Sequence, residues 1–245
     1  MTPRVTFAVA GRVLTQLRRD HRTAAMLLVL PCLLISLMWW MFEDSLGEPF
    51  DRFGPALLAM FPFIVMFLVT SVTTLRERSS GTLERLLAMP MGKLDFLLGY
   101  AIAFGLVAAL QALIAVGVSV GLLGLEIEGS VWLLGLVAVA DAVLGSALGL
   151  FVSAFAQTEF QAVQFLPAIV FPQILLCGLF VPRDTLPEAL SAASDVLPLS
   201  YAVDAMTHLT RGTSTSDVWV DLAVVAAFAV AALALGAATL RRRTP

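Results

Sequence analysis

The apolar residues of this chain are gathered into six long runs that short polar segments separate. The runs cover residues 24–42, 55–75, 96–123, 131–155, 162–181 and 218–240. Each run holds roughly the 20 apolar residues that a helix needs to cross about 30 Å of hydrocarbon. Because a bilayer core offers no water to backbone N–H and C=O groups, such runs fold as helices. The pattern predicts an all-α integral membrane protein with six transmembrane helices in a single domain over residues 1–245.

Residues 4–20, which precede the first run, show a different periodicity. On a helical wheel the apolar residues, Val9 among them, share one arc, whereas Arg4, Arg12 and Arg19 gather on the other. This pattern is typical of an amphipathic helix that lies in the membrane interface and turns its arginines to anionic lipid headgroups. A secretory signal is the alternative, but the first run is longer than the apolar part of a signal and ends in Trp-Trp-Met-Phe rather than in a cleavage site.

Composition and charge agree with a membrane setting. Hydrophobic residues make up 59% and charged residues 13% of the chain, and its mean hydropathy is +0.92, which excludes an ordinary soluble domain. Of the 15 Lys and Arg residues, all but Arg52, Arg183 and Arg211 lie on one side of the expected topology. The positive-inside rule then places both termini in the cytoplasm of a bacterial plasma membrane. Cys32 and Cys177 lie in apolar runs and are expected to pack there, with no metal site.

The longest charged segment between two runs contains a short helical pattern at residues 79–90. Leu83, Leu86 and Leu87 recur at i, i+3 and i+4, and Pro90 ends the pattern. The segment is predicted to be a cytoplasmic helix of about two turns. So short a helix is marginal alone, because nucleation is costly, and it should pack on a partner. A solvated turn is the alternative.

A second unusual segment, residues 182–217, lies between the fifth and sixth runs on the expected outer side. It holds two helix-like pieces, punctuated by Pro182, Pro187 and Pro198. The first piece should end before Pro198, and Ser200 is expected to cap the second. Pieces as apolar as these are expected to fold back on the outer ends of the spans as a lid or plug.

Several residues inside the runs are candidates for a substrate pathway or a dimer interface. An aromatic and thioether cluster in the second run suits amphiphilic cargo, although packing or lipid contact is the alternative; it comprises Phe61, Phe63, Met66 and Phe67. In the fifth run, polar residues accompany two helix-breaking prolines, a combination tolerated where a neighbour or a cavity satisfies the freed groups. The candidates there are Gln161, Gln164, Phe165 and Gln173.

Asp141 is the remaining intramembrane candidate, because a carboxylate at the middle of a span costs about 3 kcal/mol on insertion scales. Its alternatives are a functional group and a neutral or hydrogen-bonded interior aspartate. Gly145 and Gly149 on the same run form a G-x-x-x-G pattern, which indicates close helix packing.

Two stretches resemble recurrent regions of the ABC type 2 permeases, the membrane subunits of bacterial ATP-binding-cassette exporters, in their drug-resistance branch. The first lies after the second run and is carried by Glu77, Arg78, Gly81, Thr82, Leu83, Glu84, Leu86, Leu87 and Pro90. The second follows the fifth run and is carried by Gly178, Pro182, Pro187, Leu197, Pro198, Tyr201 and Asp204.

The resemblance implies a permease subunit that a separate ABC ATPase drives. Two ATPase copies would bind ATP and Mg²⁺, since this sequence lacks a G-x-x-x-x-G-K-[ST] phosphate-binding loop and is expected to hold no cofactor and no catalytic residue. The residues that carry the first resemblance, together with Arg85, would dock into that ATPase. A second permease subunit, identical or similar, would complete a dimer embedded in membrane lipid, with no nucleic-acid partner. The expected activity is export of a hydrophobic drug, antibiotic or lipid-like substrate, as in multidrug efflux and antibiotic resistance.

Two other functions are considered. A proton-coupled secondary transporter would use Asp141 as its relay and need no ATPase. An intramembrane hydrolase is disfavoured, because Ser146 stands one place too early for a G-x-S-x-G motif.

Overall fold

The computed structural model describes residues 3–42, 49–79 and 93–239, and within these ranges the secondary structure is helical. Five of the helices are long and single: α2 His21–Phe42, α3 Pro49–Ser79, α5 Lys93–Gly121, α6 Val131–Ser153 and α11 Thr215–Thr239. The fifth apolar run instead forms three consecutive pieces: α7 Glu159–Phe165, the π-helix η1 Leu166–Val170 and α8 Phe171–Leu176. The remaining elements are α1 Pro3–Arg19, the 3₁₀ turn η2 Arg183–Thr185, α9 Glu188–Asp195 and α10 Pro198–Thr210.

Six of these helical segments are long and apolar enough to cross a membrane, counting α7, η1 and α8 as one. This confirms the predicted all-α membrane fold with six spans. The largest differences from the predicted bounds are at the second span, which begins at Pro49 instead of residue 55, and at the fifth, which ends at Leu176 instead of residue 181. The predicted fifth span was too long because the residues after Leu176 are apolar although they form a turn. Gly178 in this turn has a φ of +93°, a conformation that favours glycine.

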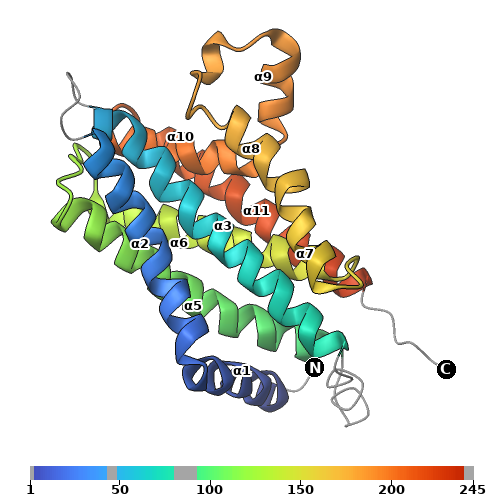
Figure 1. The fold of residues 1–245 in the computed structure, drawn as a ribbon. Helices are drawn as coiled ribbons and strands as arrows, with labels where there is room; N and C mark the ends of the chain where they lie inside the picture. Colours follow the sequence, from blue (N-terminus) through green and yellow to red (C-terminus); the bar gives the residue numbers. More distant parts are fainter. Residues whose placement is uncertain (1–2, 43–48, 80–92, 240–245) are drawn as a thin grey trace.

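The centre of the bundle is the contact between α3 and α6 (Figure 1). About two thirds or more of the apolar window of each helix is buried, 67% in α3 and 72% in α6, against 17% in α2. Gly145 and Gly149 of α6 lie directly on the α3 backbone: a Cβ added to either would lie 2.5 Å from the carbonyl oxygen of Phe63 or Phe67, respectively. The G-x-x-x-G pattern thus serves close packing within the chain.

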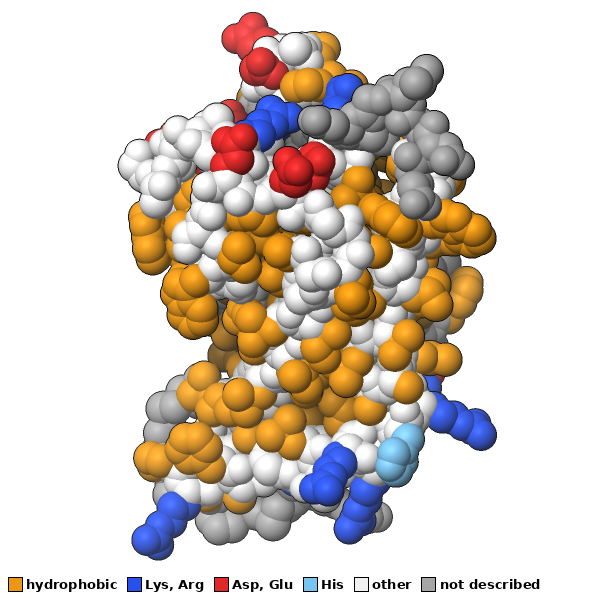
Figure 2. All heavy atoms as spheres, turned by 90° about the vertical axis from the view of Figure 1, so that its left-hand side faces the viewer, with side chains coloured by type: hydrophobic (Ala, Val, Ile, Leu, Met, Phe, Trp, Pro, Cys, Tyr) orange, Lys and Arg blue, Asp and Glu red, His pale blue; other side chains and the backbone are white. Residues whose placement is uncertain are grey.

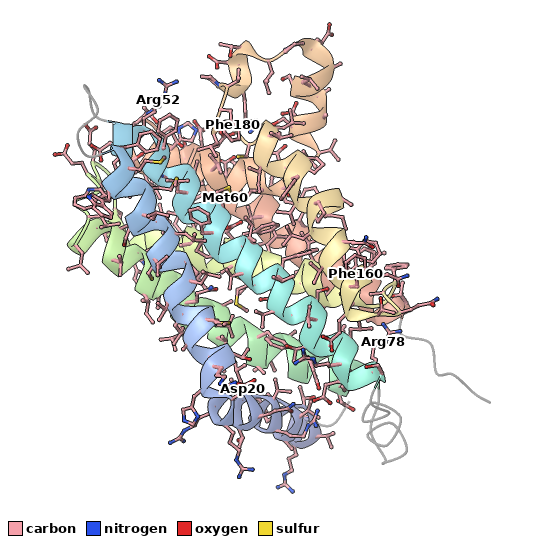
Figure 3. The ribbon with its side chains drawn as sticks, in the orientation of Figure 1. Asp20, Arg52, Met60, Arg78, Phe160 and Phe180 are labelled. Carbon is pink, nitrogen blue, oxygen red and sulfur yellow. The ribbon has the colours of Figure 1, made fainter. Side chains whose placement is uncertain are left out.

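Two ends of the bundle can be told apart. The α1 end carries α1, which lies across the spans, together with Asp20 and Arg78; the α9 end carries α9, Arg52 and Phe180 (Figures 1 and 3). Basic side chains gather at the α1 end and acidic ones at the α9 end, and a broad hydrophobic belt separates them (Figure 2). This distribution places the predicted interfacial helix and the predicted outer loop at opposite ends.

The segment between the fifth and sixth spans folds only partly as expected. The second piece, α10, packs on α3, α6 and α11 and buries Leu199, Met206 and Leu209, whereas α9 stays largely exposed. The prediction that Ser200 caps α10 is wrong. Leu197 is the N-cap, Pro198 occupies the first turn, and the Ser200 hydroxyl is instead 3.1 Å from that of Ser194. Proline suits this position because it lacks the N–H that would be unpaired there.

Candidate functional site

The last turn of α3 is bonded to three other elements at the α1 end. Arg76 donates two hydrogen bonds to the Glu159 carboxylate at the start of α7, at 2.7 and 3.0 Å. Glu77 pairs with Arg12 of α1 at 3.1 Å, and Arg78 donates to the Ser153 carbonyl oxygen at the end of α6. The residues that directly precede the predicted cytoplasmic helix at residues 79–90 are therefore bonded to α7, α1 and α6.

The rest of that predicted helix lies outside the described residues, which stop at Ser79 and resume at Lys93. The positions concerned are Gly81, Thr82, Leu83, Glu84, Arg85, Leu86, Leu87 and Pro90. Their docking role stays a prediction. Glu77 and Arg78, which were grouped with them, make contacts within the chain.

Helix α1 has the expected amphipathic form, with one exception. Val9, Ala10 and Val13 are buried, and Arg4 and Arg19 are exposed. Arg12, predicted to face lipid headgroups with them, instead points into the molecule, where its Nη2 donates to Glu77 and, at 2.8 Å, to the Tyr100 hydroxyl. The long arginine side chain can reach inward from the margin of the apolar arc, so a helical wheel assigns its guanidinium to the wrong side.

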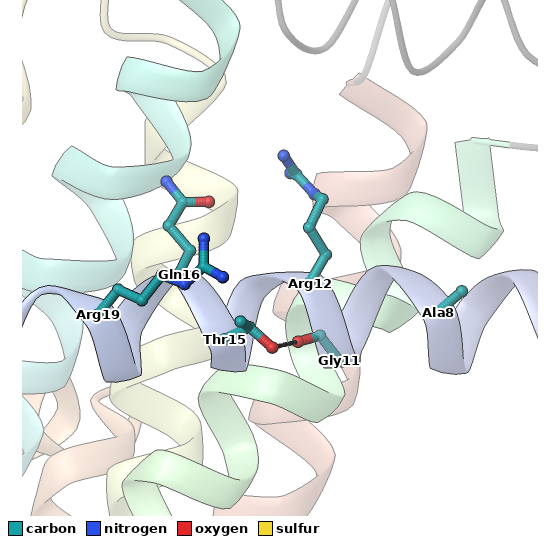
Figure 4. Close-up of a pocket in the computed structure, with 6 residues that line it drawn as sticks. All are labelled: Ala8, Gly11, Arg12, Thr15, Gln16 and Arg19. Carbon is teal, nitrogen blue, oxygen red and sulfur yellow. Dashed lines mark hydrogen bonds between the residues drawn. The ribbon is translucent and has the colours of Figure 1, made fainter.

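A hollow of about 440 Å³ lies along the α1 surface beside Arg12 (Figure 4). It is lined by Ala8, Gly11, Arg12, Thr15, Gln16 and Arg19. Gly11 leaves open space beside the helix, since a Cβ added there would meet no atom within 4 Å. The Thr15 hydroxyl donates back to the Gly11 carbonyl oxygen at 2.7 Å.

The polar residues of the fifth span have separate structural roles. Thr158 caps α7 by accepting from the Gln161 N–H at 3.2 Å. The Gln161 side chain in turn accepts from the N–H of Gln157, the residue before the cap, at 2.8 Å. Gln173 is buried; it donates to the Ile169 carbonyl oxygen and accepts from the Leu199 N–H at the start of α10. These contacts support structural roles for Gln161 and Gln173.

Gln164 and Phe165 remain candidates for a pathway or dimer surface. Gln164 is exposed and Phe165 is half-buried in this span, only 17% of whose apolar window is buried within the chain. An exposed amide inside the apolar belt is unfavourable against lipid, so a protein or substrate contact there would stabilise it.

The aromatic cluster of the second span lies mostly inside the chain. Phe63, Met66 and Phe67 are fully buried, and Phe61 is half-buried. Phe63 and Phe67 present their carbonyl oxygens to the two close-packing glycines of α6. Their placement supports the packing alternative over a pathway role.

Asp141 lies in α6 with no exposed surface, and neither of its carboxyl oxygens has a hydrogen-bond partner within the described residues. Buried polar atoms are nearly always bonded, which makes this carboxyl an exception that calls for an explanation. The hydrogen-bonded alternative receives no support from the described residues.

Arg183 organises the α9 end, and sequence analysis did not single it out. Its guanidinium pairs with Asp195 at 2.6 Å and with Asp204, and it lies 5.3 Å from the centre of the Tyr201 ring. Tyr201 in turn donates to the Asp195 carbonyl oxygen at 2.8 Å. Burial raises the pKa of the Asp204 carboxyl, and the charge of Arg183 opposes that rise. The contacts join η2, α9 and α10, which include the predicted outer-loop residues Tyr201 and Asp204.

Comparison with known proteins places these features in a family context. Residues 4–210 match the family model described as ABC-2 type transporter. The chain is 30% identical over 171 residues to "Probable multidrug ABC transporter permease YbhR" of Escherichia coli, covering 69% of this chain and 46% of that protein. It is 26% identical over 180 residues to "Probable multidrug ABC transporter permease YbhS" of the same organism, covering 73% and 47%.

A further relative comes from a eukaryote. The chain is 26% identical over 186 residues to "ABC transporter G family member 20" of Dictyostelium discoideum, which covers 73% of this chain and 26% of that protein. The matched part of the chain spans about half or less of the length of these curated relatives.

Proposed function

This chain belongs to the ABC-2 type transporter family, and from that premise we propose that it is the membrane permease subunit of an ATP-driven exporter. The match over residues 4–210, together with six apolar helices, is the observation that carries the proposal. A separate ABC ATPase, in two copies, binds ATP and Mg²⁺ and supplies the power stroke. The segment at residues 79–90 is the docking element for that ATPase.

The cargo is a hydrophobic or amphiphilic molecule such as a drug, an antibiotic or a lipid. Support comes from relatives whose names include the words "multidrug ABC transporter permease" and from the apolar character of the spans. Two permease subunits, identical or similar, form the pathway between them, with Gln164 and Phe165 of the sparsely covered fifth span at the interface. The complex lies in a bacterial plasma membrane, with both termini and α1 in the cytoplasm, a topology that the basic α1 end supports.

Co-purification with the ATPase tests this proposal. The chain is expressed with the ABC ATPase encoded nearest to it, and wild type is compared with the double variant Leu83→Asp/Leu87→Asp. We expect wild type to retain the ATPase and the variant to lose at least about tenfold in affinity, because two buried charges in a helix-in-groove contact lack partners. Leu190→Asp/Val196→Asp is the matched control, since both residues are exposed on or beside α9 at the opposite end.

Retention by wild type and the control, with loss in the variant, supports the permease reading. A folded wild-type protein that retains no ATPase contradicts it. In that event the buried, unpartnered carboxyl of Asp141 favours the second candidate, a proton-coupled transporter. Its expected signature is ATP-independent efflux of ethidium, a cationic amphiphile, driven by a pH gradient and abolished by Asp141→Asn.

A further inference from the structure

Arg12 is the point where three helices meet at the α1 end. It donates from α1 to Glu77 in the last turn of α3, at 3.1 Å, and to Tyr100 near the start of α5, at 2.8 Å. The Glu77 side chain is 7% exposed and Tyr100 has no exposed surface, so this ion pair is shielded from solvent on the carboxylate side. Charge-assisted bonds in such a setting are stronger and more specific in geometry than surface ion pairs.

The two partners of Arg12 lie on opposite sides of the predicted docking segment. Glu77 precedes residues 80–92 in the chain, and Tyr100 follows them. Arg12 therefore bonds, through one guanidinium, to both helices from which that segment extends.

Helix α1 is held against α5 by further contacts one or two turns away. Thr6 donates to the buried Asp95 carboxylate at 3.2 Å. Val9 lies directly on the α5 backbone, since a Cβ added to Gly99 would stand 2.6 Å from the Val9 Cγ1 atom. Within the described residues α1 packs broadly on α5 and little on α3. The α1–α5 pair is thus already fixed by packing, and α3 also packs on α5. The Arg12–Glu77 ion pair bonds α1 to the end of α3, on which α1 itself packs little.

We propose that Arg12 is a positioning residue that makes α1, the end of α3 and the start of α5 move as one unit when the ATPase acts on the segment between them. The inference rests on the proposed function, because it assigns Arg12 a part in transmitting the ATPase's movement. It gives Arg12 a role different from lipid contact, and it makes Glu77 an internal partner and not a docking residue.

A charge-swap experiment tests the proposal with the full complex. The variants are Arg12→Glu, Glu77→Arg and the double variant Arg12→Glu/Glu77→Arg. Arg19→Glu is the matched control, because it makes the same charge change at an exposed position of the same helix. Each variant carries Gln164→Cys as a reporter in a Cys32→Ala/Cys177→Ala background, and labelling by a maleimide is compared without nucleotide and with ATP plus vanadate.

We expect every variant to retain the ATPase. The change in Gln164→Cys labelling caused by ATP plus vanadate should fall in Arg12→Glu and in Glu77→Arg by at least about fivefold, the lower end of typical coupling between sites. The double variant should regain the nucleotide response, and Arg19→Glu should behave as wild type. Rescue by the swap is a result that a general loss of folding cannot produce.

Three results would overturn the inference. They are an unchanged nucleotide response in Arg12→Glu, a double variant that stays unresponsive, and loss of the ATPase from Arg12→Glu, which would make Arg12 a docking contact. If a single charge reversal fails to give a monodisperse protein, Tyr100→Phe and Arg12→Gln replace it, and both should reduce the response while retaining the ATPase. Failure of the proposed function is distinguishable, since it would appear as absence of the ATPase from wild type.

Discussion

The Asp204 carboxyl at the α9 end makes the free energy of unfolding depend on pH, because burial shifts its pKa. Its carboxyl is partly enclosed beneath Arg183, and burial outweighs the arginine so that the pKa lies above the ordinary value of 3.8. An acid whose pKa is raised by folding holds its proton more tightly in the folded state than in the unfolded state. Folding is therefore favoured below the ordinary pKa, and that contribution is lost as the pH rises through the raised value.

We predict from this that the thermal unfolding midpoint of wild type falls relative to that of Asp204→Asn as the pH rises from about 3.8 toward neutrality. The amide does not titrate, so the variant lacks this contribution. Differential scanning fluorimetry in detergent across pH 4 to 7 measures the difference. Glu188→Gln, at an exposed position of α9, is the control and should not alter the slope. A difference that is constant with pH would contradict the prediction.

Arg183 and Arg12 hold their respective ends of the molecule by the same physical means. Each is a long cation that reaches a buried or half-buried carboxylate on another helix and also contacts a tyrosine. Arginine suits such positions because its guanidinium offers several donors in a fixed plane and stays charged.

At the scale of the element, the contact between α3 and α6 depends on two positions without side chains. Gly145 and Gly149 let the α6 backbone rest on the carbonyl oxygens of Phe63 and Phe67. Within a bilayer the hydrophobic effect does not drive helices together, so van der Waals contact at small residues carries much of the association.

We predict that Gly145→Ala and Gly149→Ala each destabilise the fold by about 1–3 kcal/mol, because the added methyl would overlap backbone atoms that cannot move aside. Unfolding in mixed micelles measures the change. Gly117→Ala is the matched control: that glycine lies exposed in α5 with open space around it, and its replacement should be neutral or stabilising by up to about 1 kcal/mol. Equal effects at the three positions would show that close packing is not the cause.

At the scale of the whole molecule, charge and hydrophobicity divide the surface into three zones. On the face shown in Figure 2, most basic side chains lie at the α1 end, the acidic ones lie at the α9 end, and an apolar belt separates the two ends. In the topology that we propose, the α1 end lies on the cytoplasmic side of the bilayer, as the positive-inside rule expects.

We predict that single cysteines at Arg18 and Thr213, in a Cys32→Ala/Cys177→Ala background, label from opposite sides of the membrane. Both positions are exposed, one on α1 and the other between α10 and α11. A membrane-impermeant maleimide should react with Thr213→Cys in intact spheroplasts and with Arg18→Cys only in inverted vesicles. Labelling of both sites from the same side would contradict the six-span topology, and exchange of the two patterns would reverse its orientation.

The number of spans and the amphipathic α1 could be predicted because they depend on local properties, the length and the period of apolar runs. The contacts of the candidate site were harder to predict from the sequence. Gln161 and Gln173 were selected as polar residues in an apolar run, yet their partners are the cap of α7 and the start of α10. Glu77 was selected with the docking segment, yet it pairs with Arg12, which is far away in the sequence.

The sequence by itself determined that this protein is all-helical with six membrane spans, because the length and hydrophobicity of a span depend on contiguous residues. The permease family came from the resemblance of two local stretches to that family. Only the tertiary structure decided which polar groups meet: Arg12 with Glu77 and Tyr100, and Arg183 with Asp195 and Asp204. The physical reason is that the direction of a long side chain, and the burial that gives its contacts strength, depend on how distant helices pack, which no local pattern contains.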